Sequence, residues 1–81
     1  MEAKKDIQKR LNYVKGQLNG LTKMLEEEKD CVSILTQFKA AQAGLEKAGS
    51  LFAKSYLLHC LHDPKRSAED LETLLRQALK F

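Results

Sequence analysis

The sequence predicts a small all-α protein with three helices per chain. Its 81 residues contain one proline, four glycines and no tryptophan, while the helix-favouring residues Leu, Ala, Lys and Glu are abundant. Apolar residues recur at helical spacing in three separate segments. Hydrophobic residues make up 43% and charged residues 31% of the chain, which is typical of a globular domain. We therefore expect residues 1–81 to form one helical domain.

The first helix is expected from about residue 4 to residue 28. Its apolar residues recur at steps of three and four and form one stripe. The stripe consists of Ile7, Leu11, Val14, Leu18, Leu21 and Leu25. Residues 1–23 carry six basic against two acidic side chains, a net charge of +4. Gly16 and Gly20 share one face, where we expect another backbone or a DNA phosphate to approach closely.

A second, long helix is expected from Cys31 to about His62, with Asp30 as its N-cap. This segment has no proline and only four charged residues, so most of its surface must be covered. A helix of about 48 Å is too long for a monomer of this size to bury. We therefore expect two chains to pack their long helices antiparallel, in a four-helix bundle with the first helices.

A third helix follows the only proline. The segment 62–64, which contains Pro64, is expected to end the long helix because proline disfavours helix at the residue before it. Ser67 and Asp70 have the spacing of a capping box. Leucines at positions 71, 74, 75 and 79 then predict a short amphipathic helix that runs to about residue 80.

Composition also limits the function. No stretch approaches the roughly 18–20 apolar residues of a membrane span, and the N-terminal residues lead into no signal-peptide core. We therefore expect a cytoplasmic protein with reduced thiols and no membrane partner. The chain is short for an enzyme with a buried active site, so we expect neither enzymatic activity nor a cofactor. The net charge of +3 permits a nucleic-acid partner without requiring one.

The two cysteines carry the strongest functional signal. Cys31 and Cys60 are 29 residues apart, about eight helical turns, so both lie on one face, about 43 Å apart. A disulfide within the chain is excluded, since it needs Cα atoms within about 7 Å. In an antiparallel dimer, Cys31 of one chain meets Cys60 of the other. The helix dipole favours a thiolate at Cys31, so we expect Cys31 to attack and Cys60 to resolve.

Other interpretations stay open. In the first of these, the protein is a helical adaptor and both cysteines are inert residues that only pack. Alternatively, they bind Cu(I) or Zn(II) together with His59 or His62. Those histidines point about 80° and 140° away from the face that carries the cysteines, which weakens the metal interpretation. A thiol oxidoreductase is disfavoured because the sequence has no Cys-x-x-Cys motif.

Several residues of the first two helices form a recognisable pattern. The pattern consists of Arg10-Leu11, Gly16-Gln17-Leu18-x-Gly20-Leu21, Met24, Asp30-Cys31 and Gln37-x-x-Ala40-Ala41. It resembles the signature of the copper-sensing operon repressor (CsoR) family, over nearly the whole chain. The resemblance implies an antiparallel homodimer that assembles into a homotetramer, a dimer of dimers. It also implies a transcriptional repressor that releases operator DNA when an inducer occupies the cysteine site.

The ligand positions separate the branches of this family. Its copper sensors have cysteines at the positions of Cys31 and Cys60 and a histidine where this chain has Tyr56. The pattern cysteine, non-histidine, cysteine resembles the CsoR-like sulfurtransferase repressor (CstR) branch. That resemblance implies a sensor of persulfides or polysulfides that links its cysteines between subunits, with no metal ligand. A Cu(I)-sensing repressor of the same family is the alternative, since two thiols can hold Cu(I) in linear coordination.

The basic first helix predicts the DNA contacts. Its positive charge, repeated in each subunit of a tetramer, gives a surface that can follow phosphates. The resemblance implies Arg10 as an operator contact, and Gln17 matches the family's block and offers an amide to a base edge or phosphate. Lys9 and Lys47 are the other candidate basic contacts. Tyr13 stands where the family often has an arginine.

Overall fold

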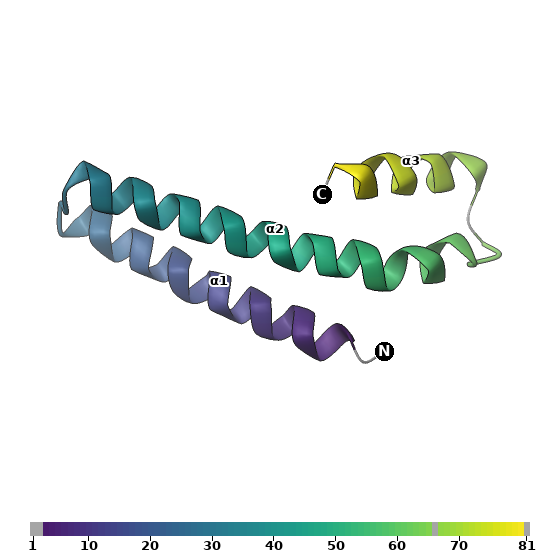
Figure 1. Ribbon diagram of the computed structural model, residues 1–81, viewed down its shortest axis with the longest axis horizontal. Coiled ribbons are helices and arrows are strands. Elements are labelled where there is room, and N and C mark those ends of the chain that lie inside the picture. Colours follow the sequence, from purple (N-terminus) through teal and green to yellow (C-terminus); the bar gives the residue numbers. More distant parts are fainter. Residues whose placement is uncertain (1–2, 66, 81) are drawn as a thin grey trace.

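The described residues form three α-helices joined by short connections (Figure 1). The computed structural model describes residues 3–65 and 67–80, without the side chains of Leu58, Cys60 and Leu61. Helix α1 spans Ala3–Glu26, α2 spans Cys31–Leu61 and α3 spans Ala68–Leu79. The predicted all-α class with three helices is confirmed. None of these helices combines the length and the apolar character of a membrane-spanning segment.

The helices form a hairpin with a short third arm. Helices α1 and α2 lie side by side and antiparallel, and α3 folds back along the second half of α2, on the side away from α1 (Figure 1). Within residues 3–65 and 67–80, contacts between helices join α1 to α2 and α2 to α3 only. The molecule is 51 Å long but only 24 and 15 Å across. So thin an arrangement has little interior.

The turn after α1 contains a left-handed residue. The amides of Glu28 and Lys29 donate hydrogen bonds to the carbonyls of Leu25 and Met24, at 3.2 and 3.0 Å. These two bonds form the Schellman motif that often ends a helix. Glu28 has a φ of 53°, a conformation that costs residues other than glycine about 1–2 kcal/mol. This turn explains why α1 ends at Glu26 instead of reaching residue 28.

Both predicted caps are confirmed at the starts of α2 and α3. The carboxylate of Asp30 accepts hydrogen bonds from Ser33, at 3.1 Å from the backbone amide and 2.7 Å from the hydroxyl. These bonds, the hydroxyl bond first, lower the pKa of Asp30 below its ordinary value. At α3, the Ser67 hydroxyl oxygen accepts a 3.2 Å hydrogen bond from the amide of Asp70. The caps therefore fix where both helices begin.

The buried core of the described residues is small. It consists of Val14 and Leu21 from α1 and Ala41 and Ala48 from α2. Much larger apolar side chains are exposed on both helices. Among them are Leu11, Leu18, Leu25, Val32, Leu35, Phe38, Leu45 and Phe52. Half of the predicted stripe on α1 is therefore uncovered in a single chain, and such a surface favours association with another protein.

The close approach of α1 and α2 depends on Gly44. A Cβ atom there would lie 3.0 Å from Cγ2 of Val14 and 3.3 Å from Oε1 of Gln17. The predicted approach of a neighbouring backbone at Gly16 and Gly20 is wrong within the described chain. A Cβ at Gly20 would meet the side chain of Gln37, and one at Gly16 would meet nothing within 4 Å.

Candidate nucleic-acid interface and sensor thiol

An open groove of about 820 Å³ lies between α1 and α2. Its lining includes all four residues that the sequence predicted as DNA contacts. These are Lys9, Arg10 and Gln17 from α1 and Lys47 from α2. The lining recurs at helical spacing, at positions 6, 9, 10, 13 and 17 on α1 and 40, 43, 44 and 47 on α2. The structure thus brings the four candidates together in one groove, while their contact with DNA stays a prediction.

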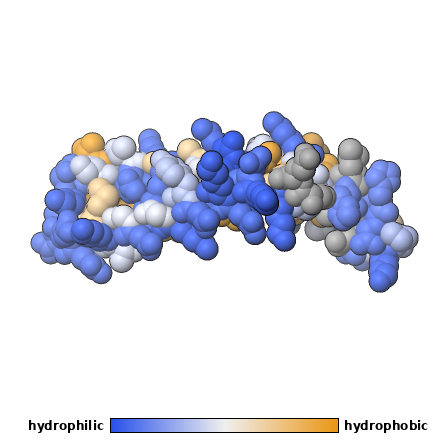
Figure 2. All heavy atoms as spheres, turned by 90° about the horizontal axis from the view of Figure 1, so that it is seen from below, coloured by the Kyte–Doolittle hydropathy of each residue, from blue (hydrophilic) through white to orange (hydrophobic). Residues whose placement is uncertain are grey.

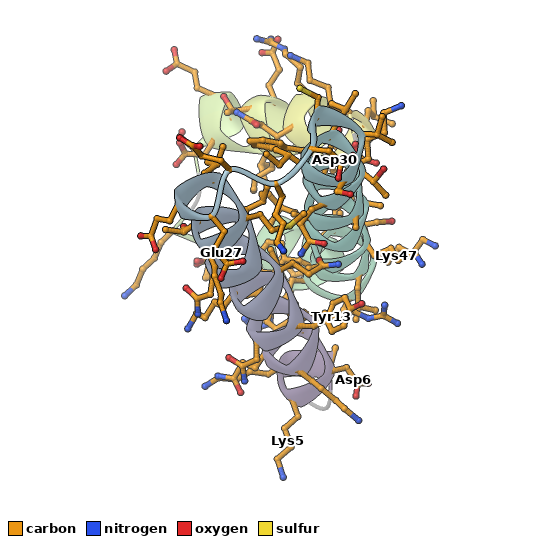
Figure 3. The ribbon with its side chains drawn as sticks, turned by 90° about the vertical axis from the view of Figure 1, so that its left-hand side faces the viewer. Lys5, Asp6, Tyr13, Glu27, Asp30 and Lys47 are labelled. Carbon is orange, nitrogen blue, oxygen red and sulfur yellow. The ribbon has the colours of Figure 1, made fainter. Side chains whose placement is uncertain are left out.

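The charge of this groove is predominantly positive. Lys9, Arg10 and Lys47 face one acidic lining residue, Asp6. Figure 3 shows the side chains of Asp6, Tyr13 and Lys47 on the same side of the molecule. The surface seen from the α1 side is largely hydrophilic (Figure 2). A groove with an excess of cations can attract the phosphates of a nucleic acid.

The cations of the groove are available to a ligand. Ion pairs among the described residues involve other basic side chains, at Lys23, Lys29 and Arg76. Lys9, Arg10 and Lys47 are also exposed to solvent. An anion that enters the groove therefore does not have to displace an internal carboxylate from them.

Gln17 is partly buried between the two helices, so its amide is less free to move than one on an exposed surface. Its backbone carbonyl accepts a 3.1 Å hydrogen bond from Nε2 of Gln37 on α2. Its side-chain oxygen, Oε1, is buried against Gly44 and has no hydrogen-bond partner among the described residues. Leaving a buried acceptor unpaired costs about 1–3 kcal/mol. The side chain of Gln17 therefore gains by turning toward any donor that enters the groove.

Five lining residues were not among the predicted DNA contacts. They are Asp6, Tyr13, Ala40, Ala43 and Gly44. Asp6 and Tyr13 lie one turn before and one turn after the pair of basic residues on α1, and Gly44 faces them from α2. The signal for Asp6 was its spacing of three or four residues from Lys9 and Arg10. Tyr13 has the same spacing, but the resemblance marked it only as the residue where the family often has an arginine. Gly44 had no such signal, because its role depends on how closely the two helices pack.

The predicted sensor residue Cys31 is the first residue of α2. Its thiol is free and exposed, next to the Asp30 cap. The backbone of Cys60 lies in the last turn of α2, but its side chain is outside the described residues. The predicted pairing of Cys31 with Cys60 therefore stays a prediction. Within the described residues, no group of three or more His, Cys, Asp or Glu side chains is placed to hold a metal ion.

Tyr56 stands at the position where the resemblance to the family's copper sensors would place a histidine, and its ring is stacked on another aromatic ring. Tyr56 stacks on Phe52, with ring centroids 4.9 Å apart and an interplanar angle of 12°. Its phenol is a poor ligand for Cu(I), which prefers thiolates and imidazoles. Tyr56 therefore packs along α2 and does not supply a third soft ligand.

The thiol and the groove lie apart on the same helix hairpin. Ala40 and Lys47 of the groove follow Cys31 by nine and sixteen residues. At the rise of an α-helix these separations are about 14 and 24 Å. Cys31 is therefore not part of the groove lining.

The comparisons with known proteins assign the chain to a family. The profile of the family described as metal-sensitive transcriptional repressor matches residues 3–80. The chain belongs to this family, which bears out the resemblance to copper-sensing operon repressors. The finer assignment to the persulfide-sensing branch is not supported by the relatives described next.

Two similar relatives are named as copper sensors. The copper-sensing transcriptional repressor RicR of Mycobacterium tuberculosis is 35% identical over 60 residues, 74% of this chain and 62% of the relative. The copper-sensing transcriptional repressor CsoR of Bacillus subtilis is 32% identical over 66 residues, 82% of this chain and 65% of the relative. The chain thus spans less than two thirds of both proteins.

A third relative matches over more of its own length. The uncharacterized protein YrkD of Bacillus subtilis is 30% identical over 56 residues, 69% of this chain and 89% of the relative. No solved structure matches the chain significantly.

Proposed function

We propose that this chain is an operator-binding transcriptional repressor whose inducer acts on a pair of thiols shared between two subunits. The observation that carries the proposal is the groove, in which Lys9, Arg10, Gln17 and Lys47 lie together. The groove supplies three cations for phosphates and one amide for a base edge or a phosphate. The chain acts by binding and not as an enzyme.

Self-association supports this function. Leu18 and Leu25 on α1 and Phe38 and Leu45 on α2 are about half exposed in the single chain, and burying them requires a partner of similar length. A second copy in the antiparallel arrangement covers both apolar faces and brings Cys31 beside Cys60 of the partner subunit. Two such homodimers in a homotetramer place several basic grooves on one DNA duplex.

Cu(I) is the inducer that the relatives favour. Both RicR and CsoR are named copper-sensing, and two cysteine thiolates suit a soft cation in two-coordinate geometry. The free, exposed thiol of Cys31 fits this donor set. A bridge from Cys31 to Cys60 of the partner subunit changes how the two hairpins pack against each other. To turn a 99:1 preference for the DNA-bound form into its reverse, the inducer must favour the released form about 10⁴-fold.

Tyr56 favours a second candidate, a persulfide or polysulfide. Because its ring stacks on Phe52, the site offers two thiols and no imidazole. The thiolate of Cys31 attacks the sulfane sulfur of an organic persulfide, forms a Cys31 persulfide and releases the organic thiolate. Cys60 of the partner subunit then attacks the inner sulfur of Cys31 and expels hydrosulfide. The result is an intersubunit disulfide, with the organic persulfide as the oxidant.

One experiment tests the function and separates the two inducers. The reduced protein first selects a binding duplex from a random DNA library, and the complex is then treated with Cu(I) or with an organic persulfide. Release by Cu(I) without a covalent product supports the copper sensor. Release by persulfide with a covalent dimer in the intact mass supports the sulfur sensor. Failure to select any duplex, or a normal response of Cys31→Ser to both inducers, would contradict the proposal.

A further inference from the structure

Tyr13 is an exposed aromatic ring among the cations of the groove. Its side chain is 67% exposed, and it lines the groove together with Lys9, Arg10 and Lys47. In Figure 3 it lies on the same side as Lys47. Covering a ring of this size removes a large apolar area from water, which stabilises the complex that covers it.

Among the described residues, the ring of Tyr13 has no stacking partner. Apart from the exposed Lys47, the α2 wall of the groove presents the small residues Ala40, Ala43 and Gly44, and the side chain of Tyr13 stays 67% exposed. The stacked pair among the described residues is Phe52 with Tyr56, and Tyr13 has no such neighbour. The exposed face of the Tyr13 ring is therefore open to a ligand that binds in the groove.

The ring also lies away from the apolar surface that a second copy would cover. At about 100° per residue, Tyr13 points roughly 140° from Leu18 and 160° from Leu11 around α1. Leu11 and Leu18 belong to the exposed apolar face of α1. Tyr13 instead shares its side of α1 with Asp6, Lys9 and Gln17, the other groove residues. It is therefore placed toward the ligand of the groove.

The mixed lining indicates a ligand with an uncharged part beside its charges. Lys9, Arg10 and Lys47 attract phosphates, while the carboxylate of Asp6 repels them. A double-stranded DNA offers both kinds of surface, because the edges of its bases lie between two lines of phosphate. Thymine in particular presents a methyl group that packs against apolar side chains.

We propose that the ring of Tyr13 makes an apolar contact with a base edge of bound DNA, and that this contact provides sequence discrimination beside the phosphate-binding cations. The proposal rests on the proposed function, since it needs DNA in the groove. It assigns to the phenyl ring, and not to the hydroxyl, a direct part in recognition. The contact carries no charge, so it does not contribute to the salt dependence of binding.

The test compares three proteins on two DNAs. Wild type, Tyr13→Ala and Tyr13→Phe are titrated with the duplex that wild type selects from a random library and with a duplex of scrambled sequence. Tyr13→Ala should lose roughly tenfold in affinity for the selected duplex, as for one mismatched base pair. Its affinity for the scrambled duplex and its salt slope should be unchanged. Tyr13→Phe should behave as wild type, because it keeps the ring.

A substitution that adds charge gives an independent readout. Tyr13→Arg should bind both duplexes more tightly and discriminate less between them. The slope of log affinity against log salt concentration should become steeper by about 0.9. Equal losses of Tyr13→Ala on both duplexes, or no loss on either, would overturn the assignment. A changed oligomeric state of Tyr13→Ala would also overturn it, since the ring would then contact another copy. If wild type selects no duplex, the proposed function fails instead.

Discussion

The side-chain amide of Gln37 donates a hydrogen bond to the backbone carbonyl of Gln17, at 3.1 Å. On α2, this bond starts from a residue between Cys31 and the part of the helix that lines the basic groove. Gln37 follows Cys31 by six residues, about 9 Å along the helix, and the side chain of Gln17 lines the groove. The pair therefore links α2 to α1 beside the groove.

Removing this bond should destabilise the hairpin. Gln37→Ala removes the bond between the two helices, although the carbonyl of Gln17 keeps its partner within α1, so the free energy of unfolding should fall by about 1 kcal/mol. Urea denaturation at one fixed protein concentration measures this change, because the stability of an oligomer depends on concentration. Gln8→Ala, at an exposed position of α1, is the control and should stay within about 0.5 kcal/mol of wild type. Equal stabilities of the two variants would contradict the role of Gln37.

The same substitution at two glycines should have opposite effects. Gly16→Ala enters open space and should raise the free energy of unfolding by about 0.5–1 kcal/mol through helix propensity. Gly44→Ala gains the same helix propensity but places a Cβ 3.0 Å from Val14. The resulting overpacking should lower the free energy of unfolding by about 1–3 kcal/mol. Thermal unfolding of both variants compares them directly. If Gly44→Ala is as stable as Gly16→Ala, the close helix contact does not depend on Gly44.

The cap of α2 should make stability depend on acid pH. Hydrogen bonds from Ser33 lower the pKa of Asp30 below its ordinary 3.8, so their contribution is complete above about pH 4 and disappears as the pH falls through the lowered pKa. Ser33→Ala should raise the pKa of Asp30, which an NMR titration of its carboxyl carbon measures. Its stability deficit against wild type should shrink on acidification. Thr36→Ala, which removes a hydroxyl that bonds the carbonyl of Val32, should show no such trend.

A cation inside the groove should matter for DNA and one outside it should not. Lys47→Ala should weaken binding to any duplex. It should also make the slope of log affinity against log salt concentration shallower by about 0.9, as expected when one phosphate contact is lost. Lys39→Ala removes an equal charge from the same helix but outside the groove lining, and it should leave the slope unchanged. Fluorescence anisotropy at several salt concentrations gives both slopes. Identical slopes for the two variants would argue against the groove as the DNA site.

The helices were predictable because their signals are local. Apolar spacing and the capping residues Asp30 and Ser67 lie within a few positions of the helix ends that they determine. The end of α1 was not predictable, because Glu28 adopts a left-handed conformation that its residue type disfavours. Only the paired hydrogen bonds of that turn show where α1 stops.

The groove was predictable as a set of residues but not as a shape. Charge and resemblance indicated Lys9, Arg10, Gln17 and Lys47, and the structure places them in one groove. Its shape depends on the close approach of α1 and α2 at Gly44, where a Cβ would lie 3.0 Å from Val14, and this approach depends on how the two helices rotate against each other. The bond from Gln37 to Gln17 has the same origin, since it joins residues 20 positions apart. Sequence periodicity carries no information on such pairings.

The intersubunit thiol site can be tested by mixing two inactive variants. Cys31→Ser and Cys60→Ser each lack one thiol of every site, so homodimers of either should form neither a tight Cu(I) site nor an intersubunit disulfide, and should keep DNA in the presence of the inducer. If the site joins Cys31 to Cys60 of the partner subunit, a refolded mixture forms heterodimers that contain one complete site. We predict that the mixture regains tight Cu(I) binding or the covalent persulfide product, in intact-mass and titration measurements. A mixture as unresponsive as its two components would contradict the shared site.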